Sequence, residues 1–274
     1  KWDDEKEKEL LRLISFVEST KDKMLHGWIG DDIRDLELVA YSDADLGGCT
    51  STDRSSTGVH LCIEGPNSYF PLHTVSKRQG SVATCTAEAE MVAGFTAYKD
   101  TVLPALPLWE LLCGREGAVA LKGDNSAMLQ VIRTGRNPTM KHLDRVHRIS
   151  VSWLHERLGD HSLRDQVRLV QAPSDAMRAD IGTKNFTDAG KFAAVSALIG
   201  VMEYEELIRR IHAQGGDGPQ GSTNTCARAV DEESDEDEAF QEFVMCAVER
   251  ERESAISPQT RMGKLLLGRA RRLL

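Results

Sequence analysis

The chain has 274 residues, of which 41% are hydrophobic, and a formal net charge of −9. This composition supports one or two folded domains, and no apolar run approaches the ~20 residues that a membrane span needs. The charged start KWDDEKEKE excludes a secretory signal, and the six cysteines form no CxxC pair. We therefore expect a reducing compartment, cytoplasm or nucleus, and not secretion. Because the sequence begins at Lys1 rather than Met, we also expect a segment of a longer protein.

The character of the sequence changes four times along the chain. Residues 1–35 place apolar side chains at helical spacing among many charges, which predicts a helical extension. Residues 36–185 alternate strand-like and helix-like stretches and form the predicted main domain. Residues 186–212 return to an amphipathic helical pattern and predict a C-terminal helical extension. Residues 213–239, rich in Gly and acidic side chains, predict a disordered acidic linker, and residues 240–274 predict a basic helical tail.

The main domain predicts an α/β fold with a five-stranded mixed sheet flanked by helices. Three strands come first, which indicates antiparallel hairpins, and the helices enter afterwards. The predicted strands are 36–43, 57–63, 69–76, 118–123 and 166–171. The predicted helices are 86–102, 107–113, 125–134, 141–158 and 174–184. Pro104 and Pro107 block helical hydrogen bonding, so we expect a break or kink near 103–107.

Four carboxylates lie among small and apolar neighbours at the ends of elements or inside a helix-like stretch. They are Asp43, Glu90, Asp124 and Asp180. Burying a charge is costly unless something compensates it, and a pair of divalent cations is one such compensation. These positions are where a metal-dependent nuclease would need its ligands.

Each of these acids also has a simpler interpretation. Asp43 and Asp124, at strand ends, could merely begin turns or cap helices. Glu88 and Glu90 are two apart on a helix and face different directions, so one of them should be a surface residue. Asp175 is better interpreted as a helix-start residue than as a ligand.

Seven short motifs occur in one order along the chain. They are Tyr41-Ser42-Asp43-Ala44-Asp45, Thr57-Gly58, Ser76-Lys77-Arg78-Gln79, Thr86-Ala87-Glu88-Ala89-Glu90, Asp124-Asn125-Ser126-Ala127, Lys141-His142-Leu143-Asp144 and Ala179-Asp180-Ile181. Together they closely resemble the ribonuclease H domain of copia-type LTR retrotransposon Pol polyproteins. The resemblance covers about residues 37–185, and residues 1–30 look like the end of the preceding reverse transcriptase region.

This resemblance implies a ribonuclease H-like fold and endonucleolytic cleavage of RNA in RNA–DNA hybrids. By motif position it assigns four catalytic and metal-binding carboxylates, Asp43, Glu90, Asp124 and Asp180, and makes Glu88 a bystander. Two Mg²⁺ ions, with Mn²⁺ as the alternative, suit oxygen ligands and can activate water for phosphodiester hydrolysis. We expect Asp43 to bridge both ions, with Glu90 and Asp124 on one side and Asp180 on the other.

The expected partners are an RNA–DNA hybrid and the reverse transcriptase region of the same polyprotein, with no membrane contact. Between residues 133 and 148, five basic side chains accompany a single acid, Asp144, which predicts a surface that follows a phosphate backbone. A solvated helix face is the competing interpretation. The candidate nucleic-acid contacts are Ser76, Lys77, Gln79, Asn125, Arg133, Arg136, Lys141, His142 and Arg145. His142 could instead pair with Asp144 or cap a helix.

Two departures from the family pattern bear on activity. Leu46 stands where a tryptophan usually follows Asp-Ala-Asp. Gly182 replaces a leucine and removes a packing side chain beside Asp180, and an interior glycine costs a helix ~1 kcal/mol relative to alanine. The alternative function is therefore a catalytically inactive relic or nucleic-acid-binding module that keeps the fold.

Overall fold

The structure is a computed structural model that describes residues 2–114, 116–136, 140–159 and 167–214. The chain divides into two compact units, and the first, Lys1–Gly216, contains all the described residues. The predicted basic tail at 240–274, and all but the first two residues of the predicted acidic linker at 213–239, lie outside them. Within the described ranges, no helix has both the length and the apolar character that crossing a bilayer requires.

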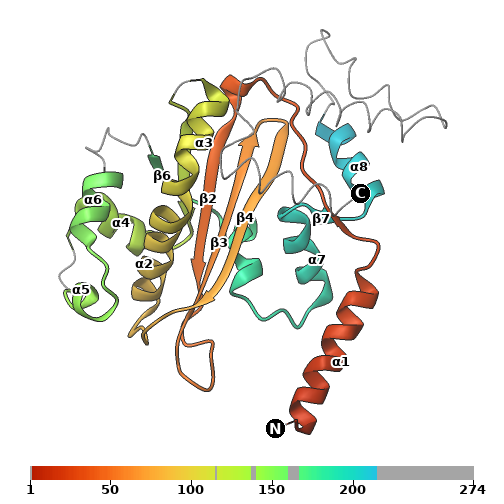
Figure 1. Cartoon of the computed structure of the whole chain (residues 1–274), viewed down its shortest axis with the longest axis horizontal. Coiled ribbons are helices and arrows are strands. Elements are labelled where there is room, and N and C mark those ends of the chain that lie inside the picture. Colours follow the sequence, from red (N-terminus) through yellow and green to blue (C-terminus); the bar gives the residue numbers. More distant parts are fainter. Residues whose placement is uncertain (1, 115, 137–139, 160–166, 215–274) are drawn as a thin grey trace, which may run out of the picture. The chain divides into compact units, whose positions relative to one another are not determined.

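A five-stranded mixed sheet, in the order β4-β3-β2-β5-β6, forms the centre of the first unit (Figure 1). β2 (Glu37–Ala44) pairs antiparallel with β3 (Ser56–Gly65), which pairs antiparallel with β4 (Ser68–Arg78). On the other side, β5 (Ala118–Gly123) runs parallel to β2, and β6 (Val167–Gln171) runs parallel to β5. The predicted α/β fold class is confirmed, including the antiparallel hairpins that open it.

Helices cover one face of the sheet and enclose the main core. α2 (Thr86–Thr96) packs on β2 and β3, and α4 (Ser126–Thr134) packs on α2, on α6 (Val151–Leu158) and on β6. The largest fully buried apolar side chains of this core are Leu38, Met91, Tyr98, Leu121, Met128, Leu129, Ile132, Leu143 and Leu154. Their burial, at ~25 cal/mol per Å² of apolar surface, is the main stabilising contribution to the layered arrangement.

The helical irregularity predicted at 103–107 occurs earlier in the chain. A π-helical stretch, Ala97–Val102, joins α2 directly to α3 (Leu103–Cys113). Pro104 then lies in the first turn of α3, directly after the π-helical stretch. A proline ring clashes with the carbonyl four residues before it, and for Pro104 that carbonyl lies inside the widened π-helical stretch. The helix is therefore not broken at 103–107: α3 runs through this stretch with Pro107 inside it, and the irregularity is the π-helical stretch that precedes it.

Two other predicted helices have a different form. The stretch 141–158 is not one helix but α5 (Leu143–Val146) and α6, separated by Arg148, which adopts a left-handed backbone with φ 57°. The stretch 174–184 contains two short 3-10 helices, η3 (Ser174–Ala176) and η4 (Arg178–Gly182).

The opposite face of the sheet carries a second, smaller core. Its buried residues are Val39, Tyr41, Cys62, Tyr69, Ala120, Ala172, Met177 and Ala179. The segment from η3 to η4 supplies the last members of this core, so it is held against β2 and β3 by apolar packing.

The N-terminal and C-terminal extensions meet in a small second sheet. Here β1 (Met24–Leu25) pairs antiparallel with β7 (Val201–Met202). Helix α1 (Asp4–Ser19) precedes β1, whereas α7 (Ala189–Leu198) and α8 (Tyr204–Gln214) flank β7 (Figure 1). The boundaries predicted for these extensions stay predictions.

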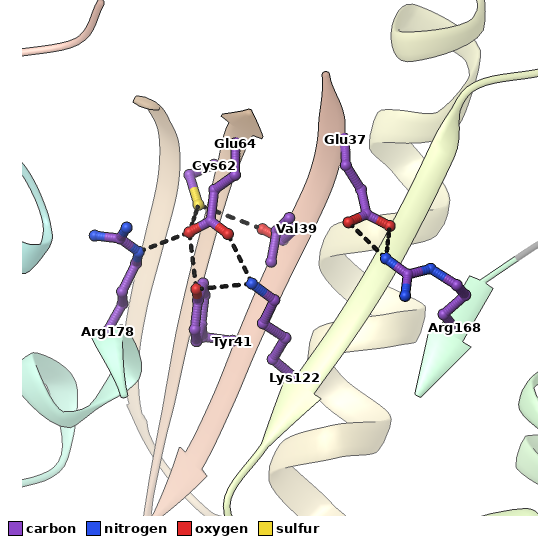
Figure 2. A network of polar contacts seen from close by, with 8 residues as sticks. All are labelled: Glu37, Val39, Tyr41, Cys62, Glu64, Lys122, Arg168 and Arg178. Atoms are coloured by element: carbon purple, nitrogen blue, oxygen red, sulfur yellow. Dashed lines mark hydrogen bonds and ion pairs between the residues drawn. The ribbon is translucent and has the colours of Figure 1, made fainter. Parts of the chain in front are cut away.

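A half-buried ionic network ties the elements of the second face together (Figure 2). Glu64 Oε1 accepts hydrogen bonds from the Tyr41 hydroxyl and Arg178 Nε, both at 2.8 Å, and Glu64 Oε2 accepts one from Lys122 Nζ at 2.7 Å. Burial by itself raises the pKa of Glu64, but the two cations lower it below its usual value overall. One carboxylate on β3 therefore connects β2, β5 and η4.

Two glycines allow η4 to lie directly against β3. A Cβ on Gly58 would lie 2.5 Å from the Ala179 carbonyl oxygen and 2.8 Å from Thr183 Cγ2. A Cβ on Gly182 would lie 3.1 Å from the Val75 carbonyl oxygen and 3.3 Å from the Gly58 Cα. Gly182 therefore leaves no gap beside Asp180, and it ends a 3-10 helix rather than interrupting an α-helix.

This close approach predicts the effect of Gly58→Ala. The added methyl meets backbone atoms that cannot move cheaply, so we expect a loss of about 1–3 kcal/mol in the free energy of unfolding. Gly80→Ala is the matched control, because a Cβ at Gly80 meets nothing within 4 Å, and it should change stability by less than about 0.5 kcal/mol. Urea unfolding of the full chain measures both. Equal stability of the two variants would contradict this account of η4.

Candidate active site

Asp43 lies at the end of the central strand β2, and it is 1% exposed. The Thr183 hydroxyl donates a hydrogen bond to Asp43 Oδ2, and Lys184 Nζ lies 3.4 Å from the same oxygen. The other oxygen, Oδ1, is buried without a hydrogen-bond partner. Asp43 is therefore held in place through one oxygen, while its second oxygen is left for a ligand.

Glu90, on helix α2, lies near the same carboxyl end of β2 as Asp43. Small side chains at Ala44, Ala89 and Ala93 pack together and let α2 approach β2 closely. Glu90 is 2% exposed, and its Oε2 has no hydrogen-bond partner. Burial, and then the nearby charges of Asp43 and Asp124, raise the pKa of Glu90 to about 8. At neutral pH the carboxyl group is therefore mostly protonated unless a cation compensates its charge.

Asp124 follows β5, whose carboxyl end meets that of β2 because the two strands are parallel. Asn125, not Asp124, caps α4, since its side chain accepts a hydrogen bond from the Met128 amide at 2.9 Å. Asp124 accepts a hydrogen bond from the Ser174 hydroxyl at 3.2 Å. The capping interpretation therefore does not hold for Asp124.

Asp180 lies on η4 and joins the cluster through Lys184. Lys184 Nζ is 3.8 Å from Asp180 Oδ1, an oxygen without a hydrogen-bond partner. Burial, and then the charge of Asp43, raise the pKa of Asp180 to about 6. Burial opposes the charge on Lys184, but Asp43 and Asp180 raise the pKa of its ammonium group overall. Within the part of the chain that the structure describes, the four acids therefore share one cation, Lys184.

The residues present fit a divalent metal ion. Ligand oxygens of Asp43, Glu90 and Asp124 all lie within 4.8 Å of one another, and Asp180 is outside this group. Unpartnered buried oxygens on three of the four acids are costly without a cation, and hard carboxylate oxygens are the ligands that Mg²⁺ prefers. The structure thus brings the four predicted carboxylates to one edge of the sheet. Their roles as metal ligands stay a prediction.

Glu88 corrects one expectation from the sequence. The helical spacing predicts that one of Glu88 and Glu90 is a surface residue, and the resemblance makes Glu88 that residue. Both are buried, however, and the Glu88 side chain is fully buried. Its Oε1 accepts hydrogen bonds from Nε2 of His142 and of His147, at 2.9 and 2.8 Å, and its Oε2 accepts two from Thr84. Burial by itself raises the pKa of Glu88, but the hydrogen bonds from Thr84 and His142 lower it overall. His142 thus pairs with Glu88 rather than with Asp144.

Several of the predicted nucleic-acid contacts also serve the fold. Gln79 is buried, and its amide donates to the Thr57 hydroxyl and the Ala89 carbonyl. The Ser76 hydroxyl donates to the Gly182 carbonyl, and Arg133 donates to the Leu169 carbonyl. The exposed members of the set are Ser76, Lys77, Arg136, Lys141 and Arg145. The nucleic-acid role of every residue in the set stays a prediction.

Thr183 and Lys184 are site residues that the sequence patterns did not indicate. Both contact Asp43 although they are 140 and 141 positions away in the chain. The available signal was their place shortly after the Ala179-Asp180-Ile181 motif. In the structure they directly follow η4 and lie beside Asp43.

Comparison with known proteins agrees with the motifs. No protein-family model matches the chain. Over 183 residues, 65% of this chain, it is 27% identical to the retrovirus-related Pol polyprotein from transposon TNT 1-94 of Nicotiana tabacum. The chain spans only 13% of the length of that relative.

Solved ribonuclease H structures are more distant. The RNase H1 of Halobacterium salinarum is 15% identical, with a TM-score of 0.34 over 52% of this chain and 90% of its own. The compost-derived LC11-RNase H1, solved with an RNA/DNA hybrid, is 16% identical, with a TM-score of 0.37 over 53% and 93%. The PFV RNase H domain is 16% identical, with a TM-score of 0.35 over 60% and 92%. The predicted resemblance is confirmed at the level of a ribonuclease H domain of a retrotransposon Pol polyprotein.

Proposed function

We propose that the chain hydrolyses RNA endonucleolytically in RNA–DNA hybrids, with two divalent metal ions, as part of a retrotransposon-derived polyprotein. The observation that carries the proposal is the convergence of Asp43, Glu90 and Asp124. Within the described residues, Asp43 and Glu90 each keep one buried oxygen that no protein group satisfies. The similarity to a transposon Pol polyprotein supports the substrate class. Similarity of the motifs to the copia-type pattern supports membership of that subgroup.

The residues of the chain hold and orient the reacting groups. Asp43, Glu90 and Asp124 would hold one Mg²⁺ ion, and Asp43 with Asp180 would hold the second. When bound, the ions supply an activated water and stabilise the leaving 3′ oxygen. Thr183 fixes the rotation of the Asp43 carboxylate, because its hydroxyl donates to Oδ2. Within the described residues, this contact leaves Oδ1 without a hydrogen-bond partner, so Oδ1 is the oxygen that would bind a metal ion.

Lys184 compensates the acids when no metal is bound. Its ammonium group lies within ion-pair distance of both Asp43 and Asp180. One cation cannot neutralise four carboxylates, so the site still favours added positive charge. We further propose that the reverse transcriptase region of the same polyprotein is a partner, and that the protein acts in the cytoplasm or nucleus.

Cleavage of a hybrid in Mg²⁺ tests the proposed activity. Asp124→Asn and Asp180→Asn should each lower the cleavage rate at least about 100-fold, because each removes a charged metal ligand. Asp175→Asn is the matched control, since Asp175 is exposed on the neighbouring η3 and should retain the full rate. A labelled hybrid followed on a denaturing gel provides the measurement. If the folded protein shows no cleavage, or cleavage that survives in Asp124→Asn, this assignment is wrong and the inactive binding module is favoured.

The raised pKa of Glu90 predicts how stability depends on pH in the metal-free protein. The folded state binds this proton more tightly than the unfolded chain, so its stabilising effect is fully present below pH about 4.5 and lost as pH rises through about 8. Glu90→Gln removes the titration. Relative to wild type in EDTA, the variant should therefore gain about 2–3 kcal/mol in unfolding free energy between pH 6 and pH 9.

Urea unfolding at the two pH values measures this difference, and Glu37→Gln serves as a control because Glu37 pairs with the exposed Arg168 far from the site. An unfolding free energy that differs equally at both pH values would show that Glu90 does not titrate in this range.

A further inference from the structure

A hydrogen-bonded cluster around a buried carboxylate lies outside the proposed metal site and holds a separate segment of the chain. We define the clamp as Glu88, His142 and His147. Glu88 lies in the first turn of α2, two residues before Glu90, whereas both histidines flank α5, more than 50 residues later. Both histidine Nε2 atoms donate to a single carboxylate oxygen, and the side chain of His147 is only 2% exposed. The clamp therefore fixes the α5 segment to the helix that carries Glu90 (Figure 1).

Core packing and one further hydrogen bond also hold the α5 segment against the domain. Met140, Leu143 and Ile149 are each less than 7% exposed. The Ser81 hydroxyl, in the loop before α2, donates to the Val146 carbonyl at 3.2 Å. These contacts leave the segment little freedom relative to α2.

The outward side chains of this segment are basic. We define the ridge as Lys141, Arg145 and Arg148, all exposed, with Asp144 as the one exposed acid between residues 140 and 150. Arg148 adopts a left-handed backbone conformation that costs an arginine about 1 kcal/mol or more. The residues on both sides of it, His147 and Ile149, are buried, so the clamp and the core hold Arg148 in this conformation with its side chain outward.

We propose that the clamp positions the ridge to bind the phosphate backbone of a nucleic-acid duplex whose scissile bond lies at the carboxylates. This inference rests on the proposed function. Exposed Lys and Arg side chains that are held in a fixed arrangement lose less conformational freedom on binding than side chains on a loose segment. Glu88, His142 and His147 act as positioning residues in this proposal, and the ridge makes the contacts.

Binding to a fluorescent hybrid in Ca²⁺, measured across a series of salt concentrations, tests the proposal without cleavage. Replacing the three ridge residues by Gln should lower the dependence of log Kd on log salt by up to about three, roughly one for each basic side chain removed. Glu88→Gln and His147→Gln should each weaken binding about tenfold and lower the same slope. Added to the triple ridge variant, Glu88→Gln should change affinity less than about twofold, because the ridge is already absent.

Matched variants separate positioning from general destabilisation. His60→Gln removes another buried, hydrogen-bonded histidine, on the face of the sheet opposite α2. Glu37→Gln removes another paired glutamate. Both should leave the salt slope unchanged. Ca²⁺ affinity without nucleic acid, measured by calorimetry, should stay within about twofold in Glu88→Gln and His147→Gln.

Three results would overturn the proposal: an unchanged slope in the triple ridge variant, an equal effect of Glu88→Gln with and without the ridge, or a loss of Ca²⁺ affinity in Glu88→Gln. If Glu88→Gln does not fold, His147→Gln and the ridge variants still decide the question. A wild-type chain that binds the hybrid but does not cleave it in Mg²⁺ would overturn the proposed function alone.

Discussion

Buried negative charge is the constraint on which this structure depends. Glu64 and Glu88 lie on opposite faces of the sheet, and the catalytic candidates lie at its edge. A carboxylate removed from water needs hydrogen bonds and positive charge, and an uncompensated one costs several kcal/mol. The protein meets this requirement in a different way at each place. Glu64 contacts Lys122 and Arg178, and Glu88 is bonded by two histidines and Thr84.

The compensation of Glu64 also organises the candidate site. Tyr41, Lys122 and Arg178, the three donors to Glu64, each precede a candidate metal ligand by two residues (Figure 2). Their side chains converge on one carboxylate of β3, and so the elements that carry Asp43, Asp124 and Asp180 are joined at one point. The separate pair of Glu37 and Arg168 at the outer part of the sheet connects only β2 and β6.

Local sequence pattern accounts for only part of this arrangement. The antiparallel hairpins followed from three early strand-like segments, and the candidate carboxylates followed from ordered motifs, because residue type and spacing suffice for both. The partners of Glu88 did not follow, because its histidines are 54 and 59 positions away. Periodicity left one of Glu88 and Glu90 for the surface, and the resemblance assigned that place to Glu88. Nor could a local pattern show that η4 lies directly against β3. Gly182, a departure from the family pattern, allows this approach, which brings Thr183 and Lys184 to Asp43.

The balance of charge separates Glu64 and Glu88 from the candidate metal ligands. Glu64 and Glu88 have both oxygens bonded, whereas Asp43, Glu90 and Asp180 each keep one buried oxygen without a hydrogen-bond partner. The pKa of Glu64 and of Glu88 falls, whereas the pKa of Glu90 and of Asp180 rises, although all four groups are removed from water. The protein thus compensates the cost of burying a carboxylate at Glu64 and Glu88, but not at the acids gathered around Asp43. Among the carboxylates of the described residues, the buried oxygens without a partner belong to the acids gathered at Asp43. A metal-binding site requires such uncompensated charge, because carboxylates already neutralised by the protein would bind the ion less tightly.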